Sequence, residues 1–231
     1  MKNVKIGSAT LFNGDCMDYM RDLPDKFFDL AIVDPPYGIG NFSQKGNAKR
    51  NTRWKYTWNE SVPETKYFLE LDRISKNQII WGANYYNCFN KLGGAIVWFK
   101  NVVHKDMSKC EIASCSIHKR VEFVHINWSN TDKYNSEKGH DIHPCQKPTT
   151  LYDWLLQNYA KPGQKILDTH LGSGSSAIAA NKMGFEFVGI ELDADYFEAA
   201  CQRVADAAKQ TDLFGGMALE TGGIGSQSDM D

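Results

Sequence analysis

Short apolar runs that alternate with segments of helical period constrain this fold more than any other feature of the sequence. Runs of this kind are typical of strands buried on both faces of a sheet. Their alternation with amphipathic segments predicts a doubly wound, mostly parallel α/β sheet. The predicted strands cover residues 28–33, 78–81, 95–99, 121–126, 165–167 and 185–190, with a strand or short hairpin at 4–13, and the predicted helices cover 15–23, 63–75, 148–160 and 193–208.

The chain has 231 residues, 42% of them hydrophobic, which is enough for one sizeable core. We expect a single domain over residues 1–210 and a disordered tail over 211–231, which is rich in Gly, Ser and acids. No apolar run reaches the ~20 residues that cross a membrane, and the N-terminus lacks the apolar segment of a signal peptide. These features predict a cytoplasmic protein without a membrane partner.

The six cysteines are scattered and form no C-x-x-C pair, so reduced thiols are expected. A zinc site could be drawn from Cys110, Cys115, His118 and His104, but this spacing fits no common zinc template. We therefore predict no metal.

A glycine turn follows the predicted strand 165–167. Gly172 and Gly174 allow close backbone approach by a ligand, and Glu191 at the end of the next strand could accept hydrogen bonds from both hydroxyls of a ribose. Ala177 replaces the third glycine of the dinucleotide motif, which disfavours phosphate binding. A packing turn and a nicotinamide site are the alternatives.

The segment Asp34-Pro35-Pro36-Tyr37 directly follows the strand 28–33, at the sheet edge where open α/β folds bind ligands. The prolines offer no N–H, so the Pro35 carbonyl and the Asp34 carboxylate can both accept hydrogen bonds from an amine. Held in this way, a nucleobase amine can direct its lone pair at an activated methyl group. Tyr37 offers a ring face for an unstacked base. The alternative is a proline-rich turn without chemistry.

These residues resemble the DNA amino-methyltransferases in the permuted, β-class motif order, in which the Asp-Pro-Pro-Tyr motif precedes the glycine turn. The resemblance covers roughly residues 8–205, including the segments 13–16, 143–148 and 187–193. It implies a Rossmann-like fold that binds S-adenosyl-L-methionine. Thr169, His170 and Ser175 replace the proline, phenylalanine and threonine that are usual in the glycine motif of the family.

The resemblance also assigns roles. In the family, the acid equivalent to Asp15 meets the adenine of the cofactor, and the segment of Lys147 walls its methionine end. The expected catalytic residues are Asp34, Pro35, Pro36 and Tyr37. The expected cofactor-binding residues are Asp15, Cys16, Asp34, Lys147, Asp168, His170, Gly172, Ser173, Gly174, Ser175 and Glu191.

DNA is the expected partner, contacted by loops at about 40–60, 100–118 and 128–142. The first loop interleaves cations for phosphates with rings for bases. Its expected contacts are Lys45, Lys49, Arg50, Arg53 and Lys55. A solvated basic loop is the alternative. Family members are often dimers, so the resemblance also implies a homodimer.

Together these features predict an S-adenosylmethionine-dependent methyltransferase, specific for the N6 amine of a flipped adenine in DNA and typical of restriction–modification systems. Cytosine-N4 is the alternative within this class, because family members acting on cytosine more often carry Ser at the position of Asp34. A non-catalytic DNA-binding module and a nicotinamide oxidoreductase are the alternatives outside it.

Overall fold

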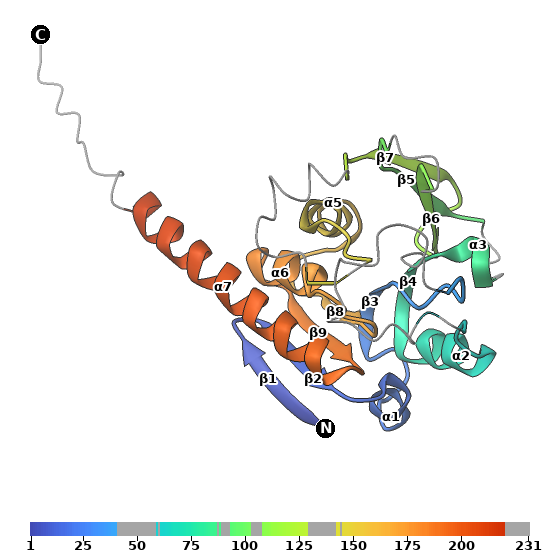
Figure 1. Ribbon diagram of the computed structural model, residues 1–231, viewed down its shortest axis with the longest axis horizontal. Helices are drawn as coiled ribbons and strands as arrows, with labels where there is room; N and C mark the ends of the chain where they lie inside the picture. The colour runs from blue at the N-terminus through green and yellow to red at the C-terminus, as the bar shows by residue number, and fades with distance from the viewer. Residues whose placement is uncertain are drawn as a thin grey trace, which may run out of the picture.

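The computed structural model describes residues 1–40, 59, 61–86, 88, 93–102, 108–128, 142–143 and 145–219, with side chains as far as residue 210. Within these residues the strands form one sheet in the order β1-β2-β9-β8-β3-β4-β6-β5-β7 (Figure 1). The strands are β1 (Lys2–Ile6), β2 (Ala9–Asn13), β3 (Phe28–Val33), β4 (Ser75–Trp81), β5 (Ala95–Phe99), β6 (Cys110–Cys115), β7 (Val121–His125), β8 (Lys165–Asp168) and β9 (Glu186–Glu191). The helices are α1 (Cys16–Arg21), α2 (Thr65–Ile74), α3 (Ala83–Tyr86), α5 (Thr149–Tyr159), α6 (Ser175–Lys182) and α7 (Ala194–Leu219).

Most strand pairs are parallel, as the sequence predicts. The central strands β2, β9, β8, β3 and β4 pair in parallel, and so do β5 and β7. The N-terminal segment forms the hairpin β1–β2, which confirms the second of the two alternatives expected there. Strand β6 runs antiparallel to both of its neighbours, β4 and β5.

Helices cover both faces of the sheet, as expected for a doubly wound fold (Figure 1). One core cluster packs α5, α6 and α7 against the sheet through residues such as Leu151, Ala179 and Phe197. The other packs α1 and α2 against the opposite face, with Met20 and Leu71 at its centre. Each face thus buries its own apolar layer, which holds the strand ends in fixed positions.

Strand β6 corrects part of the loop predicted over 100–118, because residues 110–115 form an inner strand of the sheet, whereas DNA contact by the rest of the segment stays a prediction. Sequence patterning misses it because Glu111 and Ser114 interrupt any apolar run. The strand is nevertheless inserted between β4 and β5, where Ala113 and Cys115 are fully buried. Packing of alternate residues outweighs the polar composition of the segment.

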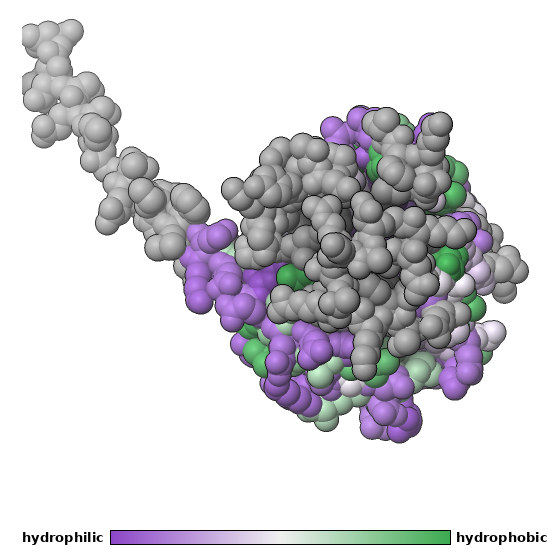
Figure 2. All heavy atoms as spheres, in the orientation of Figure 1, coloured by the Kyte–Doolittle hydropathy of each residue, from purple (hydrophilic) through white to green (hydrophobic). Residues whose placement is uncertain are grey.

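The start of the tail is also corrected, because α7 continues to Leu219 rather than ending at residue 208. Residues 205–210 are mostly good helix formers, and extending an existing helix is far easier than nucleating one. The visible surface of this part of α7 is hydrophilic (Figure 2), with an ion pair between Asp206 and Lys209. Across the described residues, no helix combines the length and the apolar character needed to cross a membrane.

Candidate active site

The carboxyl ends of the parallel strands bring the functional side chains to one edge of the sheet. Asp34 directly follows β3, Asp168 ends β8 and Glu191 ends β9. Lys100 follows β5 in the other half of the sheet, and Glu111 lies at the start of the reversed strand β6. Because β6 is antiparallel, its first residues lie at the same edge as the last residues of its neighbours.

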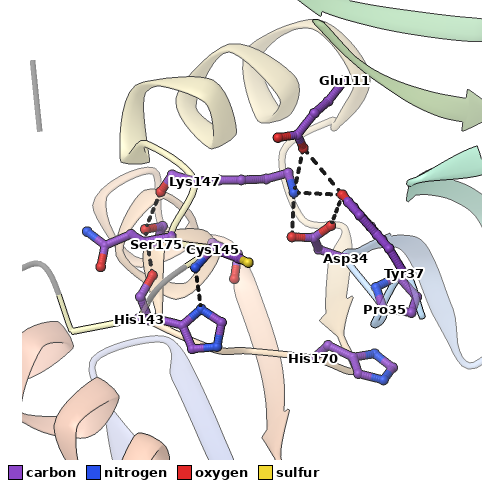
Figure 3. Close-up of polar contacts among 12 residues, drawn as sticks. Asp34, Pro35, Tyr37, Glu111, His143, Cys145, Lys147, His170 and Ser175 are labelled. Atoms are coloured by element: carbon purple, nitrogen blue, oxygen red, sulfur yellow. Dashed lines mark hydrogen bonds and ion pairs between the residues drawn. The ribbon is translucent and has the colours of Figure 1, made fainter. Parts of the chain in front are cut away.

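A chain of alternating charges surrounds Asp34 (Figure 3). The Lys147 ammonium contacts Asp34 Oδ2 and lies 3.0 Å from Glu111 Oε2. Glu111 Oε1 in turn lies 2.8 Å from the Lys100 ammonium. The Tyr37 hydroxyl donates to Asp34 Oδ1 at 2.6 Å and lies 3.1 Å from Lys147 Nζ. Both lysines are buried, at 5% and 7% exposure, so each charge depends on its partners rather than on water.

The two carboxyl groups differ in acidity. Burial raises the pKa of Asp34, and Glu111 raises it further, although Lys147 opposes both. Burial acts in the same direction on Glu111, but the ammonium groups of Lys147 and Lys100 outweigh it and lower the pKa of Glu111 to about 2. Asp34 is therefore the more basic carboxylate of the pair, and Glu111 is a permanent negative charge.

The loop after Asp34 is held by neighbouring polar groups. The Tyr86 hydroxyl donates to the Pro35 carbonyl, which keeps a second lone pair for another donor. Asn59 accepts from the Tyr37 backbone N–H at 2.8 Å. The Tyr37 ring passes so close to Gly82 that a Cβ there would lie 2.4 Å from a ring carbon. Tyr85 stacks on one face of the Tyr37 ring, so base stacking by Tyr37 stays a prediction.

The glycine turn has the backbone conformation that the sequence predicts. Gly172 and Gly174 have φ of 52° and 78°, in the region that favours glycine. The Glu191 carboxylate accepts from the backbone N–H of Gly172 at 2.8 Å and of Asp193 at 3.0 Å. Burial raises the pKa of Glu191 to about 7. A carboxylate accepts several hydrogen bonds, so Glu191 can still receive ribose hydroxyls.

Other residues of the turn stabilise its shape. Asp168 accepts from Ser176 Oγ at 2.6 Å and from the His170 backbone N–H at 3.0 Å, and burial raises its pKa to about 6. Burial lowers the pKa of His170 to about 4, so its ring is neutral. The Arg203 guanidinium donates to the Ser173 carbonyl at 2.7 Å from α7. Asp168 thus orders the turn from inside rather than facing an open site.

Asp15 and Cys16 lie where α1 begins, beside the end of β2. The Asp15 side chain caps the helix by accepting from the Met17 backbone N–H at 2.8 Å. The carboxylate is exposed, and its second oxygen can meet a ligand. Burial raises the pKa of the Cys16 thiol to about 12, so the thiol is neutral and can line a binding site but is a poor nucleophile.

Lys147 joins the two predicted motifs. Its backbone carbonyl accepts from Ser175 Oγ at 2.8 Å, at the start of α6, while its ammonium reaches Asp34 (Figure 3). The family resemblance predicts its segment at the methionine end of the cofactor, whereas its ammonium lies on the Asp34 carboxylate. One side chain therefore connects the glycine turn to the Asp34 loop.

Several site residues have no signal in a single sequence. Glu111, Lys100 and Arg203 are buried or half-buried charges in segments without a motif. The available signal is the position of Lys100 and Arg203 beside apolar segments, where an unpaired charge would be costly and a buried partner is therefore expected. The predicted DNA contacts Lys45, Lys49, Arg50, Arg53 and Lys55 lie outside the described residues.

The thiols considered for zinc lie apart in the fold. Cys110 and Cys115 are at opposite ends of β6, the first exposed and the second buried. Among the residues that the structure describes, no group of three or more His, Cys, Asp or Glu side chains could hold a metal ion. His104 lies outside those residues.

The hydrogen-bond acceptors at this edge fit an adenosine-containing cofactor. Glu191 offers a half-buried carboxylate beside the two glycines of the turn, and Asp15 offers a second acceptor at the neighbouring strand end. Between them the Gly172 position is open, because a Cβ there would meet nothing closer than the His143 ring at 3.8 Å. A ribose and an adenine can be held here by acceptors alone, without phosphate contacts.

Comparisons with known proteins agree with this arrangement. Residues 28–202 match the family model described as DNA methylase. YubD of Escherichia coli (strain K12), named as a methylase, is 26% identical over 85% of this chain and 90% of its own length. The type II methyltransferase M.BglII of Bacillus subtilis is 20% identical over 88% of this chain and 71% of its own length.

Solved structures share the fold. The M1.HpyAVI–SAM complex aligns with a TM-score of 0.53 and 19% identity, over 84% of this chain and 99% of that one. The PvuII DNA methyltransferase, described as cytosine-N4-specific, aligns with a TM-score of 0.55 and 12% identity, over 91% of this chain and 96% of that one. The chain therefore belongs to the DNA methylase family, and it is an S-adenosylmethionine-dependent DNA methyltransferase of adenine-N6 or cytosine-N4 amines.

Proposed function

We propose that the chain methylates the N6 amine of an adenine flipped out of DNA. The observation that carries the proposal is that Asp34 and Pro35 directly follow β3 and that the Asp34 carboxylate is joined to the glycine turn through Lys147. When bound, S-adenosylmethionine supplies a sulfonium methyl group that the amine takes, leaving a neutral thioether.

The residues of the chain prepare the amine for this transfer. Asp34 and the Pro35 carbonyl accept hydrogen bonds from its two N–H groups, which favours a pyramidal nitrogen with a directed lone pair. The methylated amine must lose one proton, and Asp34 is the acceptor because its pKa is raised whereas that of Glu111 is about 2. The Tyr37 hydroxyl, with its pKa raised by burial and by both carboxylates, stays protonated and orients Asp34.

For the cofactor, we propose the contacts expected from the sequence, with Glu191 on the ribose, Asp15 and Cys16 around the adenine, and the turn 172–175 against the methionine portion. His170 and the Lys147 segment line the remaining side of the proposed cofactor site. Asp168 contributes by holding the turn, through Ser176 and the His170 backbone. The support is their common place at the carboxyl edge of β2, β8 and β9.

The choice of adenine over cytosine is supported by the acid at position 34, where family members acting on cytosine more often carry Ser. Transfer of a labelled methyl group to DNA, followed by nucleoside analysis, tests it. N6-methyladenine is expected, and N4-methylcytosine would overturn it. Asp34→Ala should abolish transfer while cofactor binding persists, whereas Asp18→Ala on the exposed face of α1 should transfer normally.

For DNA, we propose contacts by Lys45, Lys49, Arg50, Arg53 and Lys55 in the loop 40–60, with a second contributing loop at 128–142. Replacing Lys49, Arg50 and Arg53 together should weaken binding and reduce the slope of log K against log salt by about 2–3. Lys182→Ala, an exposed lysine at the end of α6, is the matched control. An unchanged slope in the triple variant would exclude the loop.

A single domain that includes the whole of α7, to Leu219, and the homodimer expected from the family are part of the same proposal. Light scattering after size exclusion should give twice the 26.1 kDa chain mass, and a chain ending at residue 219 should fold and methylate normally. A monomeric mass at active concentrations would contradict the dimer.

A further inference from the structure

Glu111 enters the site from outside the motifs that carry the proposed chemistry. It lies at the start of β6, the reversed strand that separates β4 from β5. Its side chain is 20% exposed, and both of its carboxylate oxygens face ammonium groups, Oε1 that of Lys100 and Oε2 that of Lys147. A carboxylate fixed at both oxygens is rigidly placed.

The Lys147 ammonium is shared rather than committed to one partner. It has three N–H groups, and three acceptors converge on it: Asp34 Oδ2, Glu111 Oε2 and the Tyr37 hydroxyl (Figure 3). Without the charge of Glu111, the ammonium would be attracted to Asp34 alone. Asp34 would then be neutralised by a full, buried ion pair and would become a weaker acceptor for an amine.

We propose that Glu111 is a positioning residue of methyl transfer, which holds the Lys147 ammonium between two carboxylates so that Asp34 keeps acceptor capacity for the substrate amine. Lys100 fixes Glu111 from the opposite side. This inference rests on the proposed function of Asp34 as the amine acceptor, and it applies equally to adenine and cytosine.

A proton relay through Glu111 is the competing role, since the Tyr37 hydroxyl lies 3.3 Å from Glu111 Oε2 and also bonds to Asp34. The two lysines argue against it, because both Glu111 oxygens face ammonium groups that lower the pKa of Glu111, so the group is a poor proton acceptor. Glu111 therefore acts through its permanent charge. Within the described residues, the titratable or charged groups that act on Asp34 include Lys147, Glu111, Tyr37, Tyr86, Tyr152 and Asp168, and Lys100 acts on it through Glu111.

Glu111→Gln removes the charge and keeps the shape of the side chain. We expect kcat for DNA methylation to fall about tenfold or more, with the dissociation constant for S-adenosylmethionine unchanged within about twofold. The acid limb of the kcat–pH profile should move to lower pH, because the repulsion that raises the pKa of Asp34 is lost. Glu122→Gln on β7, which breaks an exposed pair with Arg120, is the matched control and should leave the profile unchanged.

Lys100→Met provides an independent test with the opposite sign. Without this positive charge, Glu111 pairs with Lys147 alone and draws the Lys147 ammonium away from Asp34. The pKa of Asp34 should therefore rise, and the acid limb of the kcat–pH profile should move to higher pH. Opposite shifts in the two variants would support the proposal. Unmoved limbs, shifts in the same direction, or a loss of kcat that merely follows weaker cofactor binding would overturn it. If Glu111→Gln does not fold, the direction of the Lys100→Met shift decides. Failure of the wild-type protein to methylate DNA would instead refute the proposed function.

Discussion

Cofactor binding should strengthen as the pH rises through neutrality, because Glu191 must be ionised to accept two ribose hydroxyls. Burial raises the pKa of Glu191 to about 7, even though two backbone N–H groups stabilise the ionised form. Binding of a ribose adds two donors and lowers the pKa of the same group. Cofactor binding and proton release from Glu191 are therefore linked.

The size of the effect follows from the pKa. With a pKa of about 7, roughly one tenth of the carboxyl groups are ionised at pH 6 and roughly nine tenths at pH 8. The dissociation constant should therefore fall about tenfold between these pH values, which is about 1.4 kcal/mol. Glu191→Gln should bind more weakly by about 1–3 kcal/mol at pH 8 and should lose the pH dependence.

Calorimetric titration with 5′-methylthioadenosine is the sharpest assay, because this probe keeps the ribose and lacks the α-amino group, which itself titrates near pH 8. Running the titration in buffers of different ionisation enthalpy counts the released protons. Glu186→Gln, an exposed acid at the other end of β9 paired with Lys165, controls for the loss of one negative charge. The same affinity for wild-type protein at pH 6 and pH 8, with no proton release, would refute the reasoning.

Three further substitutions have defined outcomes. Gly174→Ala should lower the free energy of unfolding by about 1–2 kcal/mol in urea, since φ is 78° and the new Cβ would lie 3.0 Å from Val204; wild-type stability would contradict the strain. Tyr37→Phe should lower kcat about tenfold at unchanged cofactor affinity, because it removes the hydroxyl that orients Asp34. A tenfold rise in KM with kcat unchanged would contradict that role. Arg203→Met should both weaken cofactor binding and lower the melting temperature, because the Ser173 carbonyl loses the Arg203 donor. A change in only one of these two quantities would contradict the prediction.

The parts of the fold that the sequence predicts are those with a local signal. The run 28–33 is apolar at nearly every position, and the structure buries it in the middle of the sheet as β3. The glycine turn is predicted equally well, because positive φ at Gly172 and Gly174 is a property of those residues themselves.

The parts that it misses depend on partners distant in the chain. Strand β6 carries Glu111 where a buried strand usually has an apolar residue, and ion pairs with Lys100 and Lys147 make that charge tolerable. Those partners come from the end of β5 and from the segment before α5. No window of sequence contains the cluster, so no pattern within a window can reveal it.

The order of motifs along the chain matters less than the order of strands in the sheet. Asp34 and the glycine turn lie in distant parts of the sequence, yet they follow β3 and β8, which are paired neighbours with Ala31 opposite Leu167. Because the two strands are parallel and in register, the segments that leave them emerge side by side at one edge. A connection that preserves this pairing keeps the two segments adjacent, and Lys147, in the segment before α5, joins them through its ammonium on Asp34 and its carbonyl on Ser175.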